Sequence, residues 1–64
     1  MKVREALRII VRDGWFLAGC RGSHRQYLHP WKPGKVTIAG RPSMELAPKT
    51  WKSILRQAGL EERP

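Results

Sequence analysis

Residues 13–40 read DGWFLAGCRGSHRQYLHPWKPGKVTIAG, and this stretch decides the fold. Its aromatic and aliphatic run WFLAGC at 15–20 predicts a strand, the tripeptide RGS predicts a turn, and HRQYLH at 24–29 predicts a returning strand. The prolines and glycine of PWKPG at 30–34 predict a loop, and KVTIA at 35–39 alternates with the period of two that is typical of a strand. The stretch therefore predicts a short antiparallel sheet of three strands.

A helix is predicted before this sheet and another after it. The first begins at Val3 and ends at Asp13-Gly14, and its apolar residues recur at helical spacing. These apolar residues are Val3, Leu7, Ile10 and Val11. The second begins at Pro48, and Gly59 is placed to close it, so that Leu60 folds back on the cap. Its apolar stripe is Trp51, Ile54, Leu55 and Ala58, and we expect Trp15 and Trp51 to lie in the core.

The predicted fold class is α+β, a small α-β-β-β-α domain. We expect both helices to cover one face of the three-stranded antiparallel sheet and to leave the other face open. The double-stranded-RNA-binding domain has the same order of elements. We predict a single domain over residues 1–60 and a disordered tail over residues 61–64.

Charge is the strongest compositional signal. The chain has 64 residues, with 13 Lys and Arg against 5 Asp and Glu, which gives a formal net charge of +8. Such a balance implies an anionic partner, and nucleic acid fits best because Lys and Arg release the counterions of phosphates. A membrane fits worse, because no apolar run approaches a membrane span and the first helix lacks a large apolar face. The N-terminus does not resemble a signal peptide, and we expect a cytoplasmic protein.

No disulfide, metal or cofactor is predicted. Cys20 is the single cysteine, and a small apolar residue in a strand is the favoured interpretation over a reactive thiol. The sequence has no Cys/His cluster with zinc spacing, and Glu45, Glu61 and Glu62 fall in a loop and the tail. We therefore expect chemistry that is independent of metal ions and needs no cofactor.

Three segments together resemble the HicA toxin family. Residues 13–40 carry its pattern of a D-G-W strand start, then G-S-H and H-P across a hairpin, a K-P-G-type loop and a V-T strand. REALRIIVRDGW at 4–15 is similar to the family's opening helix, and APKTWKSILRQAGL at 47–60 is similar to its closing helix. The resemblance covers nearly the whole chain. The stretch AGRPSMEL at 39–46 departs from the family, whose members often carry a further His or a Lys near this strand end.

The resemblance implies the toxin of a type II toxin–antitoxin pair. Such a toxin is an endoribonuclease, or mRNA interferase, that cleaves mRNA and blocks translation. Its partner would be a HicB-type antitoxin that covers the active surface. The histidine of the G-S-H motif, here His24, would be the catalytic residue.

The chemistry of RNA cleavage favours the same residue. A base must take the 2′-OH proton and an acid must protonate the leaving 5′-oxygen, and imidazole titrates near enough to neutrality for either role. His24 follows the Gly22-Ser23 turn directly, so we expect it at the sheet edge or on the open face. Strand alternation puts His24 and His29 on opposite faces, which argues against a simple pair.

Five residues near the hairpin are candidates for RNA or phosphate binding. They are Arg21, Ser23, Arg25, Lys32 and Lys35, and the alternative for the four basic ones is a solvated rim. For Ser23 the alternative is a cap on the turn, which we favour over a hydrogen bond to phosphate. His29 is either a hydrogen-bonding residue that fixes the hairpin, which we favour, or a second proton carrier. Trp31 could stack on an RNA base or be buried under the antitoxin, and the sequence does not choose.

Two other classes of protein compete with the nuclease. A non-catalytic basic RNA-binding module would use the same face but would not depend on His24. A basic structural protein of the ribosomal type ranks last, because the chain has almost no basic extension.

Overall fold

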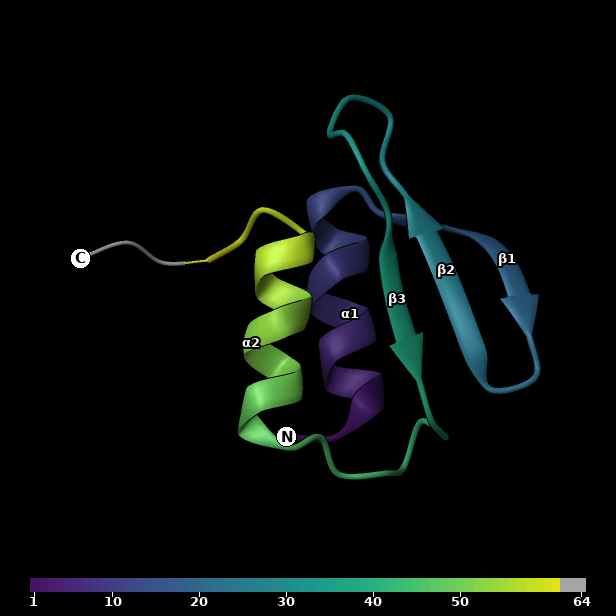
Figure 1. The fold of residues 1–64 in the computed structure, drawn as a ribbon, viewed down its shortest axis with the longest axis vertical. Helices are drawn as coiled ribbons and strands as arrows, with labels where there is room; N and C mark the ends of the chain where they lie inside the picture. The colour runs from purple at the N-terminus through teal and green to yellow at the C-terminus, as the bar shows by residue number, and fades with distance from the viewer. Residues whose placement is uncertain (62–64) are drawn as a thin grey trace.

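The computed structural model describes residues 1–61 and contains two helices and three strands (Figure 1). In chain order these are α1 (Val3–Asp13), β1 (Phe16–Arg21), β2 (His24–Leu28), β3 (Val36–Ala39) and α2 (Pro48–Gln57). The predicted α-β-β-β-α order and the α+β class are confirmed. A disordered tail is predicted for residues 61–64, and residues 62–64 of it lie outside the described residues.

The sheet is antiparallel, with the strand order β1-β2-β3. β2 is central, and its first residue, His24, lies opposite Arg21 of β1 and Ala39 of β3. The register of β1 shifts between Leu17 and Gly19, which is a β-bulge. Because the bulge is in β1, the side chains of β2 keep their regular alternation between the two faces.

One face of the sheet is covered and the other is open. In β2 and β3 the buried residues alternate with exposed or half-buried ones, and the two helices lie next to each other along β3 (Figure 1). The buried core consists of Val3, Ile10, Trp15, Tyr27, Val36, Ile38, Ile54 and Ala58. Trp51 is half-buried and packs against this core. β1 lies beyond the reach of the helices, and no residue of it is buried.

The buried stripe of α1 differs from the predicted one at two positions. Val11 is 53% exposed, whereas Ala6 is fully buried. At about 100° per residue, Val11 lies about 80° round the helix from Val3, while Ala6 and Ile10 lie on the other side of Val3. The stripe that faces the core therefore runs through Ala6 and Ile10, and Val11 faces solvent.

α1 ends at the glycine that the sequence predicts, and α2 ends at Gln57, with Ala58 as its cap and the predicted Gly59 directly after it. Gly14 has φ of 111° and closes α1 in the left-handed conformation. After α2, the Leu60 N–H donates to the Leu55 carbonyl at 2.8 Å, so Leu60 folds back on the cap as expected. Neither described helix has the length and apolar character of a membrane span.

The close approach of α1 to β2 makes Gly14 sensitive to substitution. A Cβ on Gly14 would lie 2.7 Å from Nε2 of His29, and L-residues rarely adopt its positive φ. We expect Gly14→Ala to lower the free energy of unfolding by about 1–3 kcal/mol, measured by urea denaturation. Gly19→Ala is the matched control, because no atom lies within 4 Å of a Cβ there. Equal losses in the two variants would contradict this account.

Candidate functional site

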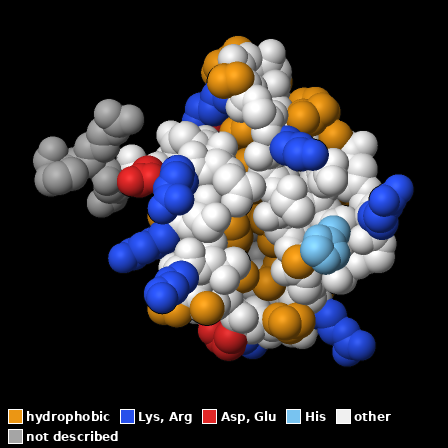
Figure 2. Space-filling model, viewed as in Figure 1, with side chains coloured by type: hydrophobic (Ala, Val, Ile, Leu, Met, Phe, Trp, Pro, Cys, Tyr) orange, Lys and Arg blue, Asp and Glu red, His pale blue; other side chains and the backbone are white. Residues whose placement is uncertain are grey.

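His24 stands exposed on the open face of the sheet. It is the first residue of β2, directly after the turn at Gly22 and Ser23. Figure 2 shows a histidine side chain at the surface of the molecule. The side chain of the other histidine, His29, is fully buried. Gln26 and Leu28 alternate onto the same face.

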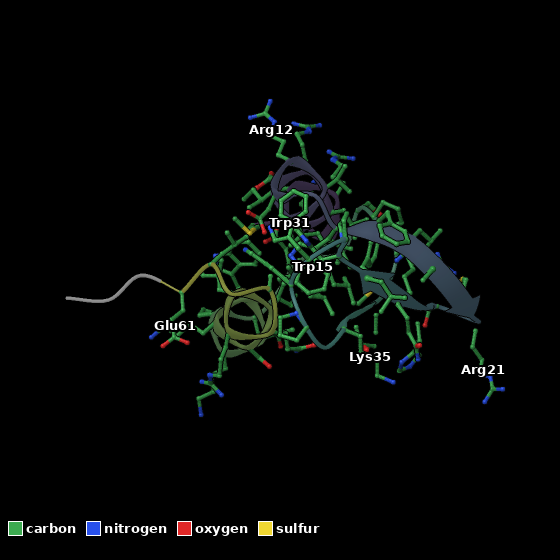
Figure 3. All side chains as sticks on the ribbon, turned by 90° about the horizontal axis from the view of Figure 1, so that it is seen from above. Arg12, Trp15, Arg21, Trp31, Lys35 and Glu61 are labelled. Carbon is green, nitrogen blue, oxygen red and sulfur yellow. The ribbon has the colours of Figure 1, made fainter. Side chains whose placement is uncertain are left out.

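Arg21 shares this face with His24. The two residues are direct partners in the β1–β2 ladder, and such partners have Cβ atoms roughly 4.5–5.5 Å apart. Arg21 is exposed at the outer tip of the sheet, far from the helices (Figure 3). Ala39 is the partner of His24 on the β3 side, and its small side chain leaves space beside the imidazole.

Ser23 and Arg25 flank His24 in sequence but make different contacts. Ser23 is exposed in the turn, and its carbonyl accepts the Gly40 N–H at 3.2 Å. Arg25 alternates onto the helix side of the sheet, where Nη1 donates to the Gly40 carbonyl at 2.7 Å. Of the two flanking arginines, only Arg21 faces the same side as His24.

Lys32, Lys35 and Trp31 lie at the opposite end of the sheet from His24. Lys32 Nζ donates to Oδ2 of Asp13 and, at 3.1 Å, to the carbonyl of Ala58. Lys35 is exposed just before β3, whose first residue pairs with Tyr27 rather than with His24. Trp31 is 77% exposed and lies over the end of α1, well away from Arg21 (Figure 3).

His29 is buried in a network of its own. Nδ1 accepts the backbone N–H groups of Trp31 and Lys32, both at 3.2 Å, so this nitrogen carries no proton. Nε2 therefore carries the proton and donates to the Asp13 carbonyl at 2.7 Å. The ring also packs edge to face with Trp15 and Trp31. Both nitrogens are occupied, and this geometry fits a hydrogen-bonding role rather than proton transfer to a substrate.

Two other titratable residues near His24, Tyr27 and Cys20, alternate onto the opposite side of the sheet. Tyr27 lies on the covered face, and burial raises the pKa of its phenol, which keeps it neutral. The Cys20 thiol is exposed and donates to the Gly22 carbonyl at 3.3 Å. Within residues 1–61, no group of three or more His, Cys, Asp or Glu side chains could hold a metal ion.

Two shallow hollows lie near His24, bordered by its neighbours in the chain and in the sheet rather than by His24 itself. One, of about 350 Å³, is lined by Gly19, Cys20, Arg21 and Gln26. The other, of about 400 Å³, is lined by Ser23, Ala39, Gly40, Arg41 and Met44. Arg41 and Met44 are not among the site residues predicted from the sequence, although pairing of the second and third predicted strands brings residues 39–41 beside His24.

The fold and this site define a small basic α+β domain that presents one histidine on an open sheet face. Residues 3–60 match the family model described as the HicA toxin of bacterial toxin-antitoxin systems, so the chain belongs to the HicA toxin family. This match confirms the resemblance drawn from the sequence. No curated protein matches the chain closely enough to count as a relative.

The contacts of Asp13 predict a loss of stability in acid. The hydrogen bond from Lys32 holds the pKa of this carboxyl below its usual value near 3.8, against the opposing effect of burial. The unfolded chain therefore binds the proton more readily, and the free energy of unfolding should fall as the pH drops below about 4. We expect Asp13→Asn to be less stable than the native chain at pH 7 and to lose less stability on acidification.

Urea denaturation at several values between pH 7 and pH 3 measures this effect. Glu5→Gln is the control, because Glu5 is an exposed carboxylate of α1. An acid dependence of Asp13→Asn as steep as that of the native chain would show that this contact does not control acid stability.

Proposed function

We propose that this chain is the toxin of a type II toxin–antitoxin pair and acts as an endoribonuclease on mRNA. The observation that carries the proposal is the exposed His24 beside Arg21 on the open sheet face of a member of the HicA toxin family. Since its substrate would be mRNA, we propose that the protein acts in the cytoplasm.

His24 would supply acid–base catalysis. Its imidazole takes the proton of a ribose 2′-OH, and the 2′-oxygen attacks the adjacent phosphorus. The bond to the 5′-oxygen breaks as that oxygen takes a proton from water, which leaves a 2′,3′-cyclic phosphate on one product and a 5′-hydroxyl on the other. A positioned acid or base alone contributes about 10²- to 10⁴-fold in rate. Arg21 would hold the phosphate and balance the charge that develops on it.

Phosphate binding would follow the exposed cations of the open face. Arg21 and Ser23 lie at the His24 end, and Lys35 lies at the far end of the sheet, where it would contact RNA outside the cleavage site. Arg25 and Lys32 already donate to backbone carbonyls, so we assign them first to the fold. Either can still offer a remaining N–H to a phosphate.

A HicB-type antitoxin would neutralise the toxin by covering the open face. The net charge of +8 favours a partner with an acidic contact surface. Trp31, exposed at the edge of the molecule, is of a residue type that often anchors protein interfaces.

One observation favours a second candidate function, a non-catalytic RNA-binding module. Among the described residues, His24 is the one imidazole on the open face, whereas RNA cleavage needs both a base and an acid. The two functions differ in what removal of His24 does.

His24→Ala should abolish toxicity while the fold and much of the RNA affinity persist. The side chain is exposed and makes no contact with the core, so its removal should change the free energy of unfolding by less than about 0.5 kcal/mol. The measurement is growth and total mRNA integrity after induction from a tight promoter, at equal amounts of folded protein. The native chain should stop growth and deplete mRNA, and His24→Ala should do neither.

Arg8→Ala, an exposed substitution on α1, is the control and should behave as the native chain. If His24→Ala arrests growth as strongly as the native chain does, the binding module is the better assignment. If neither arrests growth, this chain is not an active toxin under these conditions and the nuclease assignment falls.

Cleavage should persist in excess chelator, because the proposed mechanism needs only the imidazole, the 2′-OH and nearby cations. The measurement is cleavage of a defined RNA by purified protein with and without EDTA. Loss of activity in EDTA, with recovery on addition of Mg²⁺, would contradict metal-independent chemistry.

A further inference from the structure

The hollow beside His24 on the β3 side has a defined structural origin. It is lined by Ser23, Ala39, Gly40, Arg41 and Met44, and we call it the Met44 recess. Its floor is formed by Ala39, directly opposite His24, and by Gly40. These residues carry little or no side chain and so leave the hollow unfilled. Met44 forms an apolar wall, half of it exposed, and Arg41 adds an exposed cation at the rim.

Several hydrogen bonds hold the Met44 recess in shape. Gly40 is held from both sides, because its N–H donates to Ser23 and its carbonyl accepts from Arg25. The Met44 N–H donates to the Arg41 carbonyl at 3.0 Å, and the Arg41 N–H donates to Sδ of Met44 at 3.3 Å.

The Met44 side chain also fills the space that a Cβ on Gly40 would need. Such a Cβ would lie 3.2 Å from Sδ, and Gly40 has φ of 102°. The recess is thus preorganised, which lowers the entropic cost of binding a ligand there.

We propose that the Met44 recess binds one nucleobase of the RNA, next to the phosphate held at His24, and so helps to select where the RNA is cut. This inference rests on the proposed cleavage of RNA. A nucleobase has apolar faces and polar edges, and the recess pairs an apolar wall with a charged rim. The thioether of Met44 packs favourably against an aromatic ring, and Arg41 can hold the adjoining phosphate.

Size and position favour a base over other occupants. A volume of about 400 Å³ lies at the small end of the range for small-molecule sites, which suits one ring system. The second hollow, with Arg21, lies on the other side of His24. A strand that crosses His24 from Arg21 to Arg41 would therefore put its scissile phosphate at the imidazole and the next base in the Met44 recess.

The test is to fill the Met44 recess by substitution and to map the sites at which RNA is then cleaved. Ala39 is exposed and lies in a strand, where an aromatic residue is well tolerated, so Ala39→Phe should fold and occupy the recess. We expect cleavage at the preferred sites of a defined mRNA to fall about tenfold. Because Ala39 also lies opposite His24, the deciding readout is the base preference beside the cut, which should flatten. Ala18→Phe, at an exposed alanine in the bulge of β1, is the matched control and should cut as the native chain does.

Met44→Ala is a second variant that widens the recess instead of filling it. It should also weaken the base preference, and circular dichroism checks that both variants are folded. Unchanged cut sites and rates in both variants would overturn the inference. So would variants that cleave normally but no longer bind the antitoxin, because the recess would then serve the protein partner.

A binding experiment separates this inference from the proposed nuclease activity. A short 2′-O-methyl RNA of mixed sequence cannot be cleaved, and its titration into labelled protein should shift the backbone amide signals of residues 39–41 and 44. If those signals shift in native protein and not in Ala39→Phe, while native protein does not cut the defined mRNA, base binding in the Met44 recess is supported and the nuclease proposal fails. If RNA is cut and these signals do not move, the nuclease stands and the recess inference fails.

Discussion

The fold depends on the buried imidazole of His29. One nitrogen accepts two N–H groups of the loop that follows β2, and the other donates to the last residue of α1. Lys32 extends this link, since its ammonium group bonds both to Asp13 and to the carbonyl of Ala58 after α2. A domain of 64 residues buries little apolar surface, and this one has no disulfide. The hydrogen bonds of His29 and Lys32 join the C-terminal ends of both helices to the sheet, and they fix this arrangement more firmly than the small core does alone.

The same constraint separates the roles of the two histidines. His24 and His29 are five positions apart on and after one strand, so an odd spacing sends their side chains to opposite faces. The ring of His29 has both nitrogens bonded and no contact with solvent, whereas the ring of His24 is exposed. His29 thus has a structural role, and only the exposed His24 can contact a substrate.

The sequence predicted what is local and missed what joins distant segments. Glycines, prolines and hydrophobic periodicity gave all five elements and the ends of both helices, because these signals act within a few residues. The alternation of β2 also gave the face of His24. Proximity in sequence could not show that Arg25 turns to the Gly40 carbonyl or that Lys32 reaches Asp13 and Ala58, since these partners are 15 to 26 positions away. Arg41 and Met44 were missed for the same reason: a loop has no periodicity, and only the pairing of β2 with β3 brings it to His24.

The two ends of β2 are fixed by different means, and together they hold α1. At the His29 end the hydrogen bonds of His29 and Lys32 to Asp13 hold the last turn of α1. At the His24 end the segment 40–44 bonds to Ser23 and Arg25, and its carbonyls at Pro42 and Met44 accept the first N–H groups of α1. An exposed side chain at the start of a strand would ordinarily be free to shift, but here the backbone beneath His24 is held on both sides. Acid–base chemistry loses rate steeply when the reacting groups move by an ångström. Arg25 and Lys32 donate to backbone carbonyls near the two ends of β2. These two cations can therefore support a site at His24 more by fixing the backbone than by touching phosphate.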